Sequence, residues 1–492
     1  MRMIDRRRFL TNSAALAASL ANVGAVARLA AAGDKDAKRA TNDDVNDTLQ
    51  VAVVGVNGQG MEHVRVLAGN RALNCRVKTI CDADEGVIGR AMKHVEKVQG
   101  KLPKFQKDIR KVLDDKSIDV ITIATPNHWH ALAAVWAMQA GKDVYVEKPA
   151  SHNVHEGRKM LEAARAFGRV CQTGTQRRSM AGIREAIGFL HEGKLGRIHL
   201  ARGLCYRTRP SIGTTHGEQQ LSKTVDYDLW CGPAPRKPLH RQRLHYDWHW
   251  FWDYGNGEIG NNGIHMMDIA RWGLGKSELA KSVISVGGRF GYADDGETAN
   301  TQLCLLDYGD SRILFEVRGL PTEKLLGIDI GVIFYGSEGY LVVPSQKGPV
   351  AYSPSGEVLA KFAGDSDGIP NNFANFVGVV RSRHTNELNA DILEGHLSSA
   401  LCHLANISHR LATQEPFSKK TRAFGDDKDA FDAFGRMEDH LKDDSVSLDQ
   451  TTYLLGRKLT TKPGAESFVN DSQADALLKR QYRAPFVVPE TL

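Results

Sequence analysis

Short apolar runs alternate with longer amphipathic stretches along residues 49–174. The runs are rich in Val and Ile and have the length of buried strands, whereas the stretches between them have the length of helices. The predicted strands lie at 51–55, 76–82, 119–125, 143–149 and 169–174. Because strand and helix alternate throughout, the pattern predicts an α/β domain at 49–172 with a doubly wound parallel sheet.

A different pattern begins near residue 197. Strand-like segments follow one another with Gly, Asp and Ser between them and without regular helices, which is typical of an antiparallel sheet. These segments are 197–206, 280–286, 298–307, 311–318 and 331–336. Two helical segments, 371–383 and 391–412, are expected to cover the sheet. We predict a substrate-binding or oligomerisation domain of α+β class at 173–412, and a C-terminal extension at 413–492 that packs on the surface or contacts another subunit.

The first 32 residues have a pattern of their own. The basic segment D-R-R-R-F-L (5–10) precedes a weakly apolar, Ala-rich run that ends in L-A-A-A-G. This order predicts a cleavable signal peptide at 1–32, and its R-R-x-F-L core resembles a twin-arginine signal, which implies export to the periplasm. The alternative is a disordered basic tail. The run is too short and too polar to span a bilayer, so no membrane anchor is expected. A polar linker at 33–48 follows.

Composition and charge exclude several classes of protein. With 42% apolar and 25% charged residues, the 492-residue chain is typical of a globular protein with more than one domain. Residues 1–32 contain five arginines and one aspartate, so the leader carries +4 of the formal +6. No basic stripe remains to indicate nucleic-acid binding. The seven cysteines form no C-x-x-C, so buried free thiols are expected instead of a disulfide framework.

A glycine-rich turn, G-V-N-G-Q-G, follows the first predicted strand. Its glycines, Gly55, Gly58 and Gly60, are spaced to let the backbone approach a pyrophosphate, although Asn57 replaces the usual second glycine. Asp82 ends the next strand, where a carboxylate binds the ribose hydroxyls, and a helix N-cap is its alternative role. Because no arginine beside Asp82 would receive a 2′-phosphate, NAD is favoured and NADP is the alternative.

In a doubly wound sheet, residues that contact the ligand are expected at the carboxyl ends of the strands. Thr125, Pro126, Asn127 and His128 follow the third predicted strand, and Glu147 follows the fourth. We predict that these residues bind the cofactor together with the glycine turn and Asp82.

Seven motifs resemble the glucose-fructose oxidoreductase/inositol dehydrogenase family, Gfo/Idh/MocA. They are T-P-N-H-W-H (125–130), E-K-P (147–149), G-T-Q (174–176), Y-D-L-W-C-G-P-A-P (227–235), W-H-W-F-W-D-Y-G-N-G (248–257), G-I-H-M-M-D-I-A-R-W (263–272) and F-Y-G-S-E-G-Y-L (334–341). The resemblance covers residues 49–412. It implies an NAD(P)-dependent oxidoreductase acting on CH–OH groups of a sugar or polyol, with a Rossmann domain followed by a large, mostly antiparallel sheet. It adds Gln176 to the predicted cofactor-binding residues.

Two residues are candidates for the proton chemistry. Lys148 follows the fourth strand, where its amine can hydrogen-bond the reacting oxygen and stabilise alkoxide charge, the role that the family gives to the lysine of E-K-P. The alternative is a surface lysine paired with Glu147. His265 lies at a loop-to-helix junction, and an imidazole accepts a proton near neutral pH. Its alternative role is helix capping.

The sequence departs from the family pattern at Asn261, where the family has an Asp four residues before the histidine. An amide can orient a hydroxyl or an imidazole but supplies no negative charge. We predict that Asn261 binds substrate. Trp250 is a second predicted substrate-binding residue, because residues 246–254 are rich in aromatic rings, which can stack on sugars. Tyr206 and Arg207 are further candidates for substrate binding.

The histidine pairs His245/His249 and His128/His130 have the spacing of metal ligands, but no third ligand stands in register, so no metal is predicted. The motifs leave three functions open. The first is oxidoreduction of a sugar or polyol. The second is a redox-neutral, NAD-dependent glycosidase or lyase that acts through a transient keto-sugar. The third is a non-catalytic NAD-binding sensor, which the coexistence of a lysine and a histidine suited to proton transfer disfavours.

Export bears on the mechanism as well as on the location. A protein outside the cytoplasm has no NAD pool to exchange with, so we expect a tightly held nucleotide that is regenerated in each cycle. The expected partners are a small sugar or polyol and further copies of the same chain in a homo-oligomer.

Overall fold

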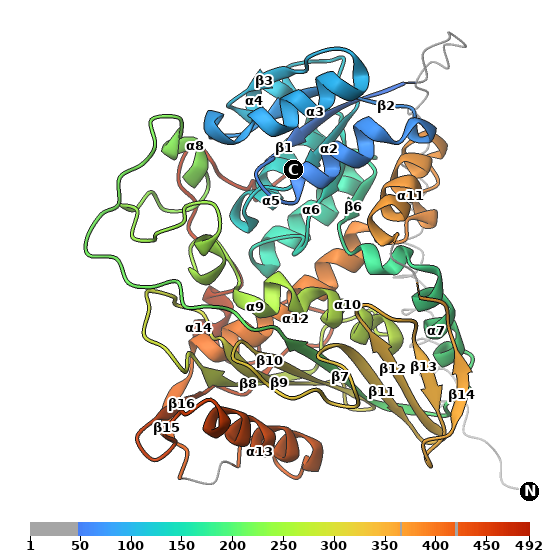
Figure 1. Cartoon of the computed structure of the whole chain (residues 1–492), viewed down its shortest axis with the longest axis vertical. Helices are drawn as coiled ribbons and strands as arrows, with labels where there is room; N and C mark the ends of the chain where they lie inside the picture. The colour runs from blue at the N-terminus through green and yellow to red at the C-terminus, as the bar shows by residue number, and fades with distance from the viewer. Residues whose placement is uncertain (1–47, 365–366, 419–421) are drawn as a thin grey trace, which may run out of the picture. The chain divides into compact units, whose positions relative to one another are not determined.

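In the computed structural model of the protein, six parallel strands form the first sheet in the order β3-β2-β1-β4-β5-β6 (Figure 1). The strands are β1 (Leu49–Val54), β2 (Cys75–Cys81), β3 (Lys104–Gln106), β4 (Val120–Ile123), β5 (Asp143–Val146) and β6 (Cys171–Thr173). The helices between them are α2 (Gly60–Gly69), α3 (Gly89–Gln99), α4 (Ile109–Leu113), α5 (Asn127–Gln139) and α6 (Val154–Ala166). The predicted doubly wound sheet is confirmed. β3 was not predicted, because its sequence K-F-Q contains a single apolar residue and does not read as a buried strand.

The structure describes residues 48–364, 367–418 and 422–492, and Thr48–Leu492 forms one unit. The predicted signal peptide, and the predicted linker up to residue 47, lie outside the described residues. Within the described ranges, no helix has both the length and the apolar character needed to cross a membrane.

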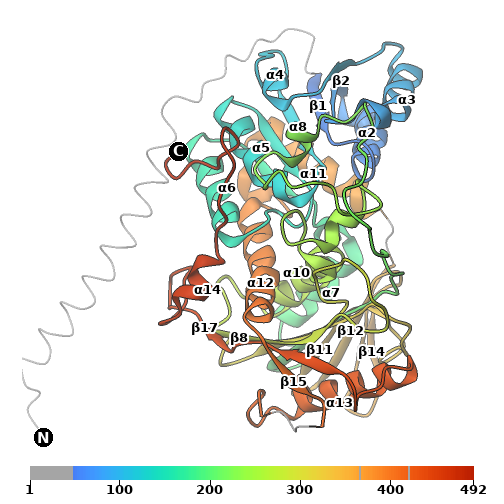
Figure 2. The same cartoon turned by 90° about the vertical axis from the view of Figure 1, so that its left-hand side faces the viewer.

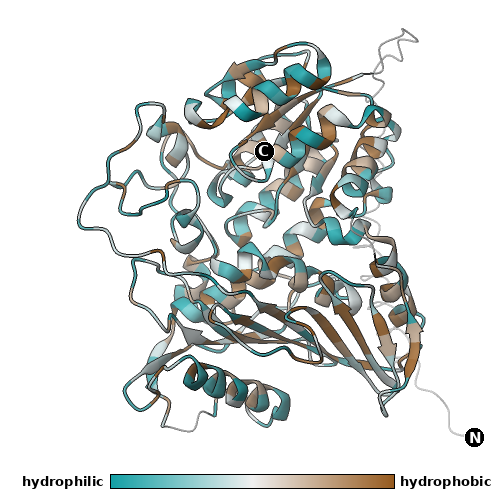
Figure 3. Cartoon of the chain, in the orientation of Figure 1, coloured by the Kyte–Doolittle hydropathy of each residue, from teal (hydrophilic) through white to brown (hydrophobic). Residues whose placement is uncertain are grey.

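Both faces of the first sheet are apolar because helices cover both faces. In β1, Val51 and Val53 belong to the core on one face, and Ala52 and Val54 belong to the core on the other. This division follows from the two-residue period of a strand. Figure 3 shows the hydrophobic strands in brown. The buried strand β1 ends at Val54, so the glycine turn begins at the next residue, Gly55.

Eleven strands form the second sheet, in the order β14-β13-β12-β11-β7-β10-β9-β8-β16-β15, with β17 paired to β8. They are β7 (Ile198–Tyr206), β8 (Ser282–Gly288), β9 (Thr301–Asp307), β10 (Arg312–Arg318), β11 (Ile330–Gly336), β12 (Gly339–Pro344), β13 (Val350–Tyr352), β14 (Val358–Lys361), β15 (Thr413–Pro416), β16 (Thr452–Leu455) and β17 (Leu459–Thr460). Only the β7–β10 pair of these described strands is parallel. The predicted mostly antiparallel sheet is confirmed.

The helices after the first sheet are α7 (Ala181–His191), α8 (Tyr227–Cys231), α9 (Gly257–Asn261), α10 (Gly263–Gly273), α11 (Gly368–Ser382), α12 (Ile392–Arg410), α13 (Lys428–Asp443) and α14 (Ser472–Ala476). The 19-residue α12 contacts α6 of the first domain as well as α10 and β8 of the second (Figure 2). It therefore joins the cores of the two domains.

α11 differs from the prediction that it would cover the second sheet. It packs on the first domain, where the rings of Phe373 and Phe376 lie 4.1 and 5.6 Å from the ring of Tyr145 in β5. Hydrophobic periodicity shows that a helix has an apolar face, but it does not show which of two sheets receives that face.

Residues 413–492 are not a separate appendage. β15, β16 and β17 belong to the second sheet, and the last residues return to the first domain. There Phe486 is 1% exposed, and its ring lies 5.5 Å from the ring of Trp129. The end of the chain therefore makes buried intramolecular contacts, where the sequence indicated surface packing or an oligomer contact.

Candidate active site

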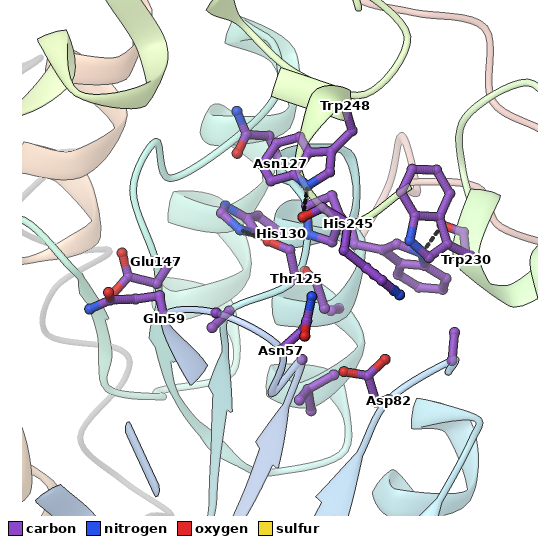
Figure 4. A pocket seen from close by; sticks show the side chains of 18 of the residues that line it. Asn57, Gln59, Asp82, Thr125, Asn127, His130, Glu147, Trp230, His245 and Trp248 are labelled. Atoms are coloured by element: carbon purple, nitrogen blue, oxygen red, sulfur yellow. Dashed lines mark hydrogen bonds between the residues drawn. The ribbon is translucent and has the colours of Figure 1, made fainter. Parts of the chain in front are cut away.

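A cavity of about 320 Å³ lies at the carboxyl ends of β1, β2, β4 and β5 (Figure 4). Residues of the first domain line one part of it, and loop 229–249 and α9 of the second domain line the rest. The lining residues that the sequence predicted are Gly55, Asn57, Gly58, Asp82, Thr125, Pro126, Asn127, Glu147, Lys148 and Asn261. They meet because parallel strands direct their carboxyl ends to one edge of the sheet.

The glycine turn brings the backbone to the cavity. Gly55 has a φ of +82°, and a Cβ at this position would lie 2.7 Å from the carbonyl oxygen of Ala124, so only glycine fits. A Cβ on Gly60 would collide with the carbonyl oxygen of Gly55, so the start of α2 lies directly against the turn. A Cβ on Gly58 would meet no atom within 4 Å. Gly55, and not Asn57, has the left-handed backbone conformation. The turn therefore forms although Asn57 replaces the second glycine of the motif.

Asp82 presents a carboxylate to the cavity near Asn57 (Figure 4). Its Oδ2 accepts the backbone N–H of Val56 at 2.9 Å, and its Oδ1 accepts that of Asp84 at 3.0 Å. Burial raises the pKa of Asp82, and the two N–H groups oppose that rise. A carboxylate has further acceptor sites, which can receive ribose hydroxyls. The alternative N-cap role falls to Asp84, which accepts the N–H of Gly86 at 2.8 Å.

The loop after β4 supplies an unpartnered hydroxyl. Thr125 Oγ1 is buried and has no hydrogen-bond partner among the described residues. Next to it, Asn127 is held by a 2.8 Å hydrogen bond from its Nδ2 to Oδ1 of Asn256. A buried polar atom without a partner indicates that another group completes the site. Together with the glycine turn and Asp82, the orphaned Thr125 hydroxyl fits the predicted NAD.

Lys148 reaches the same cavity from the end of β5. Its Nζ donates to the carbonyl oxygen of Asn261 at 2.9 Å. Burial lowers the pKa of Lys148, and two nearby arginines act in the same direction, whereas Glu147 and Glu258 raise it. The amine therefore gives up its proton more easily than an exposed lysine does. Such an amine suits a group that takes and returns a proton, and it is not the surface lysine that the sequence left as the alternative.

Glu147 lines the cavity, but its oxygens have partners within the protein. Oε1 lies 3.1 Å from Nε2 of His63, and Oε2 accepts the backbone N–H of Lys148 at 3.2 Å. Burial raises the pKa of Glu147, but His63 and Lys148 outweigh burial, so the pKa is lowered overall. Glu147 therefore holds the backbone of Lys148, and its contact with the cofactor stays a prediction.

Sequence patterns did not reveal Glu258, a carboxylate close to Lys148. Glu258 is 2% exposed and accepts hydrogen bonds of 2.9 and 2.8 Å from Arg209. Its Oε2 also lies 3.4 Å from Nδ2 of Asn261, because positions 258 and 261 share one face of α9. In the sequence, Glu258 could have been noticed as the acidic residue three positions before Asn261. A negative charge thus stands near Lys148 although position 261 is an amide.

Aromatic and imidazole rings of the second domain cover the cavity (Figure 4). Nε2 of His245 lies 2.8 Å from Oδ2 of Asp84, which joins this loop to the end of β2. The ring of Trp248 stacks on that of His249 at 3.7 Å. Burial lowers the pKa of His249 to about 3, so this ring is neutral. The two histidines with metal-like spacing therefore serve different contacts, one with a carboxylate and one with an indole.

His265 is not among the residues that line the cavity. It is 7% exposed and lies inside α10, so it is not the helix cap that the sequence left as the alternative. Burial lowers the pKa of His265 well below its ordinary value, and the charges of Lys148 and Arg177 lower it further. The neutral ring has an Nδ1 without a hydrogen-bond partner in the described part of the chain. The catalytic role of His265 stays a prediction.

Three predicted cofactor-binding residues do not line the cavity: Gly60, which lies directly behind the glycine turn, His128 and Gln176. Nε2 of His128 lies 2.9 Å from the carbonyl oxygen of Trp230. Successive residues of a helix point about 100° apart, so Asn127 faces the cavity and His128 does not. Gln176 begins the short helix Gln176–Ser179, which packs against α11.

The predicted substrate-binding residues other than Asn261 also lie off the cavity wall. The hydroxyl of Tyr206 donates to Oε2 of Glu316 at 2.6 Å, because alternate residues of β7 face opposite sides of the sheet. The ring of Trp250 lies 5.6 Å from the guanidinium group of Arg209 and supports it. Arg207 is exposed, and its charge lowers the pKa of Lys148.

Two family models match the chain. Residues 49–175 match the model described as "Oxidoreductase family, NAD-binding Rossmann fold". Residues 198–308 match the model described as "Oxidoreductase family, C-terminal alpha/beta domain". The first match contains the glycine turn, Asp82 and Lys148, so the first domain is an NAD-binding domain.

Known proteins resemble parts of the sequence and most of the fold. Inositol 2-dehydrogenase of Salmonella typhimurium is 30% identical over 185 residues, which are 37% of this chain and 53% of that protein. Alpha-N-acetylgalactosaminidase of Shewanella oneidensis is 28% identical over 181 residues, 35% of this chain and 39% of that protein. The chain thus spans about half, or less, of the length of these relatives. The WlbA dehydrogenase of Bordetella pertussis, solved with NADH and UDP-GlcNAcA, has the same fold, with a TM-score of 0.54 at 20% identity over 74% of this chain and 97% of that chain.

Proposed function

Because the chain belongs to the Gfo/Idh/MocA oxidoreductase family, we propose that it is an NAD-dependent oxidoreductase acting on a CH–OH group of a sugar or polyol. One observation carries the proposal: a single cavity holds the glycine turn, Asp82 and the partly buried amine of Lys148. A dehydrogenase needs a nucleotide site and a proton acceptor side by side. The inositol and levoglucosan dehydrogenases among the relatives support a sugar or polyol as substrate.

The residues of the cavity divide between binding and proton transfer. The turn at Gly55–Gly58, Asp82 and Thr125 would hold NAD, which supplies the hydride acceptor when bound. Nζ of Lys148 would take the proton of the substrate hydroxyl, and the carbonyl oxygen of Asn261 fixes the position of that amine. The rings over the cavity exclude water, which strengthens the electrostatic interactions inside.

Nucleotide content tests this proposal directly. We expect the purified full-length chain, once denatured, to release NAD that is detected by absorbance and mass. Sugars and polyols are then screened with and without an added electron acceptor. A protein that contains no nucleotide and binds none would overturn the proposal.

The charge of Glu258 predicts a shift of the pH profile. Glu258→Gln removes a charge that raises the pKa of Lys148 and leaves Arg209 unpaired, so both effects lower that pKa. A neutral amine is needed to accept the hydroxyl proton, so activity rises with pH through the pKa of Lys148. We expect the rising limb to move to lower pH in Glu258→Gln.

A buried carboxylate in β10, which pairs with an arginine of α13, provides the control. Glu316 pairs with Arg436 at 2.8 Å and is 3% exposed. Glu316→Gln should therefore destabilise the fold to a comparable extent while leaving the rising limb in place. Equal profiles for all three proteins would show that Glu258 does not act on Lys148.

Redox-neutral cleavage of a glycoside is the second candidate function. The similarity to an alpha-N-acetylgalactosaminidase favours it, and the same proton acceptor would serve a transient oxidation. The products separate the two functions, since the glycosidase releases an aglycone and leaves no net NADH. A non-catalytic NAD-binding sensor would retain its function after Lys148 and His265 are both replaced by Ala.

We also propose that the chain is exported to the periplasm by the twin-arginine route, where it takes part in carbohydrate metabolism as a homo-oligomer. The leader at 1–32 supports export, and folded export lets NAD enter in the cytoplasm. Cell fractionation locates the mature chain, and light scattering of the purified protein gives its oligomeric state. Loss of NAD on simple dialysis would contradict the expectation that the nucleotide is held tightly.

A further inference from the structure

A second cavity of about 320 Å³ lies apart from the nucleotide site. His403, Asn406 and Arg410 line it from one face of α12, and Trp252 and the tail segment 477–481 close it. Within the described residues, the two cavities have no lining residue in common. The C-terminal tail thus builds a pocket that a shorter chain would lack.

Asn256 separates the second cavity from the first. Its Oδ1 accepts the hydrogen bond from Asn127 on the wall of the nucleotide site, while its Nδ2 donates to the carbonyl oxygen of His152 at 2.9 Å. Asn406 donates to the backbone oxygen of Asn256 at 2.9 Å. The wall between the cavities is therefore a hydrogen-bonded layer, and the second cavity is not an extension of the nucleotide site.

Three nitrogen atoms of this cavity lack a hydrogen bond. They are Nε2 of His152, Nε2 of His403 and Nε of Arg480, all buried and all without a partner among the described residues. His403 is 4% exposed, and burial lowers its pKa to about 3, so its ring is neutral and can donate or accept. Buried polar atoms in proteins are nearly always hydrogen-bonded. Their concentration on one cavity indicates that a polar ligand completes these contacts.

Two guanidinium groups of the cavity also form no ion pair within the described residues. Arg410 lies 5.3 Å from the ring centre of Trp252, and Arg480 donates to the backbone oxygen of Asp253 at 2.9 Å. Neither has a carboxylate within 4 Å in the described part of the chain. Burial lowers the pKa of Arg410, and the charges of Glu297 and Asp253 oppose that fall without forming an ion pair with it.

The nearby acids have other partners. Asp253 pairs with Lys237 at 2.7 Å, and Glu297 accepts the backbone N–H of Trp252 at 2.7 Å. Glu156 accepts the backbone N–H of residue 152 at 3.0 Å. These carboxylates act on Arg410 and Arg480 from a distance, but none forms an ion pair with either guanidinium group, so an oxyanion from solution can supply that contact.

We propose that this cavity binds a small molecule of monosaccharide size through an oxyanion, a carboxylate or a phosphate, held between Arg410 and Arg480. Guanidinium groups bind both oxyanions through charge-assisted hydrogen bonds. The neutral imidazoles and the amide of Asn406 are suited to hydroxyl groups of the same ligand. The volume of the cavity is that of a small-molecule site. The proposal does not depend on the reaction in the first cavity.

Calorimetric titration of the full chain in excess NAD tests the proposal. The probes are inorganic phosphate, D-glucuronate and, as an uncharged comparison, D-glucose. We expect one anion per chain and no binding of D-glucose. Arg410→Gln and Arg480→Gln should each weaken anion binding about tenfold to a hundredfold, since each removes a hydrogen bond to a charged group. Arg457→Gln is the control, because Arg457 forms an exposed pair with Asp471 and does not line the cavity.

The two probes distinguish the sources of the oxyanion. Tighter binding of D-glucuronate than of phosphate identifies an acidic sugar, and the reverse identifies a phosphate. The proposal is overturned if neither anion binds, if both arginine variants bind as the wild type does, or if NAD competes with the anion. Should Arg480→Gln fail to fold, the exposed Arg410 still gives the test, with circular dichroism as the check on folding.

Discussion

Lys148→Met is expected to lower kcat/KM for the sugar or polyol about 10²- to 10⁴-fold while NAD stays bound. The change removes the amine that donates to Asn261 and replaces it with an apolar chain of similar length. The glycine turn, Asp82 and Thr125 are untouched, so the nucleotide contacts persist. The loss should therefore appear in the chemical step and not in cofactor content.

Reduction of the bound nucleotide, followed by absorbance after rapid mixing with the substrate, measures this step. Lys142→Met is the matched control, because Lys142 is also buried in the first domain, at 3% exposed, but donates to backbone oxygens of Asp115 and Ile118. The control should lose stability and keep its rate. Full turnover in Lys148→Met would show that another group accepts the proton.

Phe486→Ala is expected to lower the free energy of unfolding by about 3–5 kcal/mol, the range for a buried Phe reduced to Ala. The ring of Phe486 is 1% exposed and lies 5.5 and 6.3 Å from the rings of Trp129 and Trp136 in α5. Its removal leaves a cavity between the end of the chain and the first domain.

Urea unfolding monitored by tryptophan fluorescence measures the loss. Val487→Ala is the neighbouring control, since Val487 is 44% exposed and a surface change of this kind costs within about 0.5 kcal/mol. Similar stabilities for the two variants would mean that the tail does not anchor to the first domain.

Both large predictions concern contacts between distant parts of the sequence. Lys148 meets α9 more than one hundred positions further along the chain, and Phe486 meets α5 from the opposite end of the protein. Glu258 belongs with them, because it places a charge near Lys148 although the family pattern has its acid at position 261. Only the folded chain brings these residues together.

The amino-acid sequence by itself determined the elements and one edge of the site. β1 and its glycine turn follow from local patterns, since a buried strand needs an apolar run and a turn at φ +82° needs Gly55. Asp82 and Lys148 could be placed because parallel strands send their carboxyl ends to one edge.

Tertiary structure alone decided which further side chains meet that edge. His128 and Tyr206 were expected there, yet the rotation of α5 and the alternation along β7 turn them away. Glu258 lies near this edge because α9 packs beside Lys148. α11 covers the first sheet, although its apolar face would suit either sheet. Periodicity specifies that a face is buried, whereas the partner of that face depends on contacts between residues far apart in the chain.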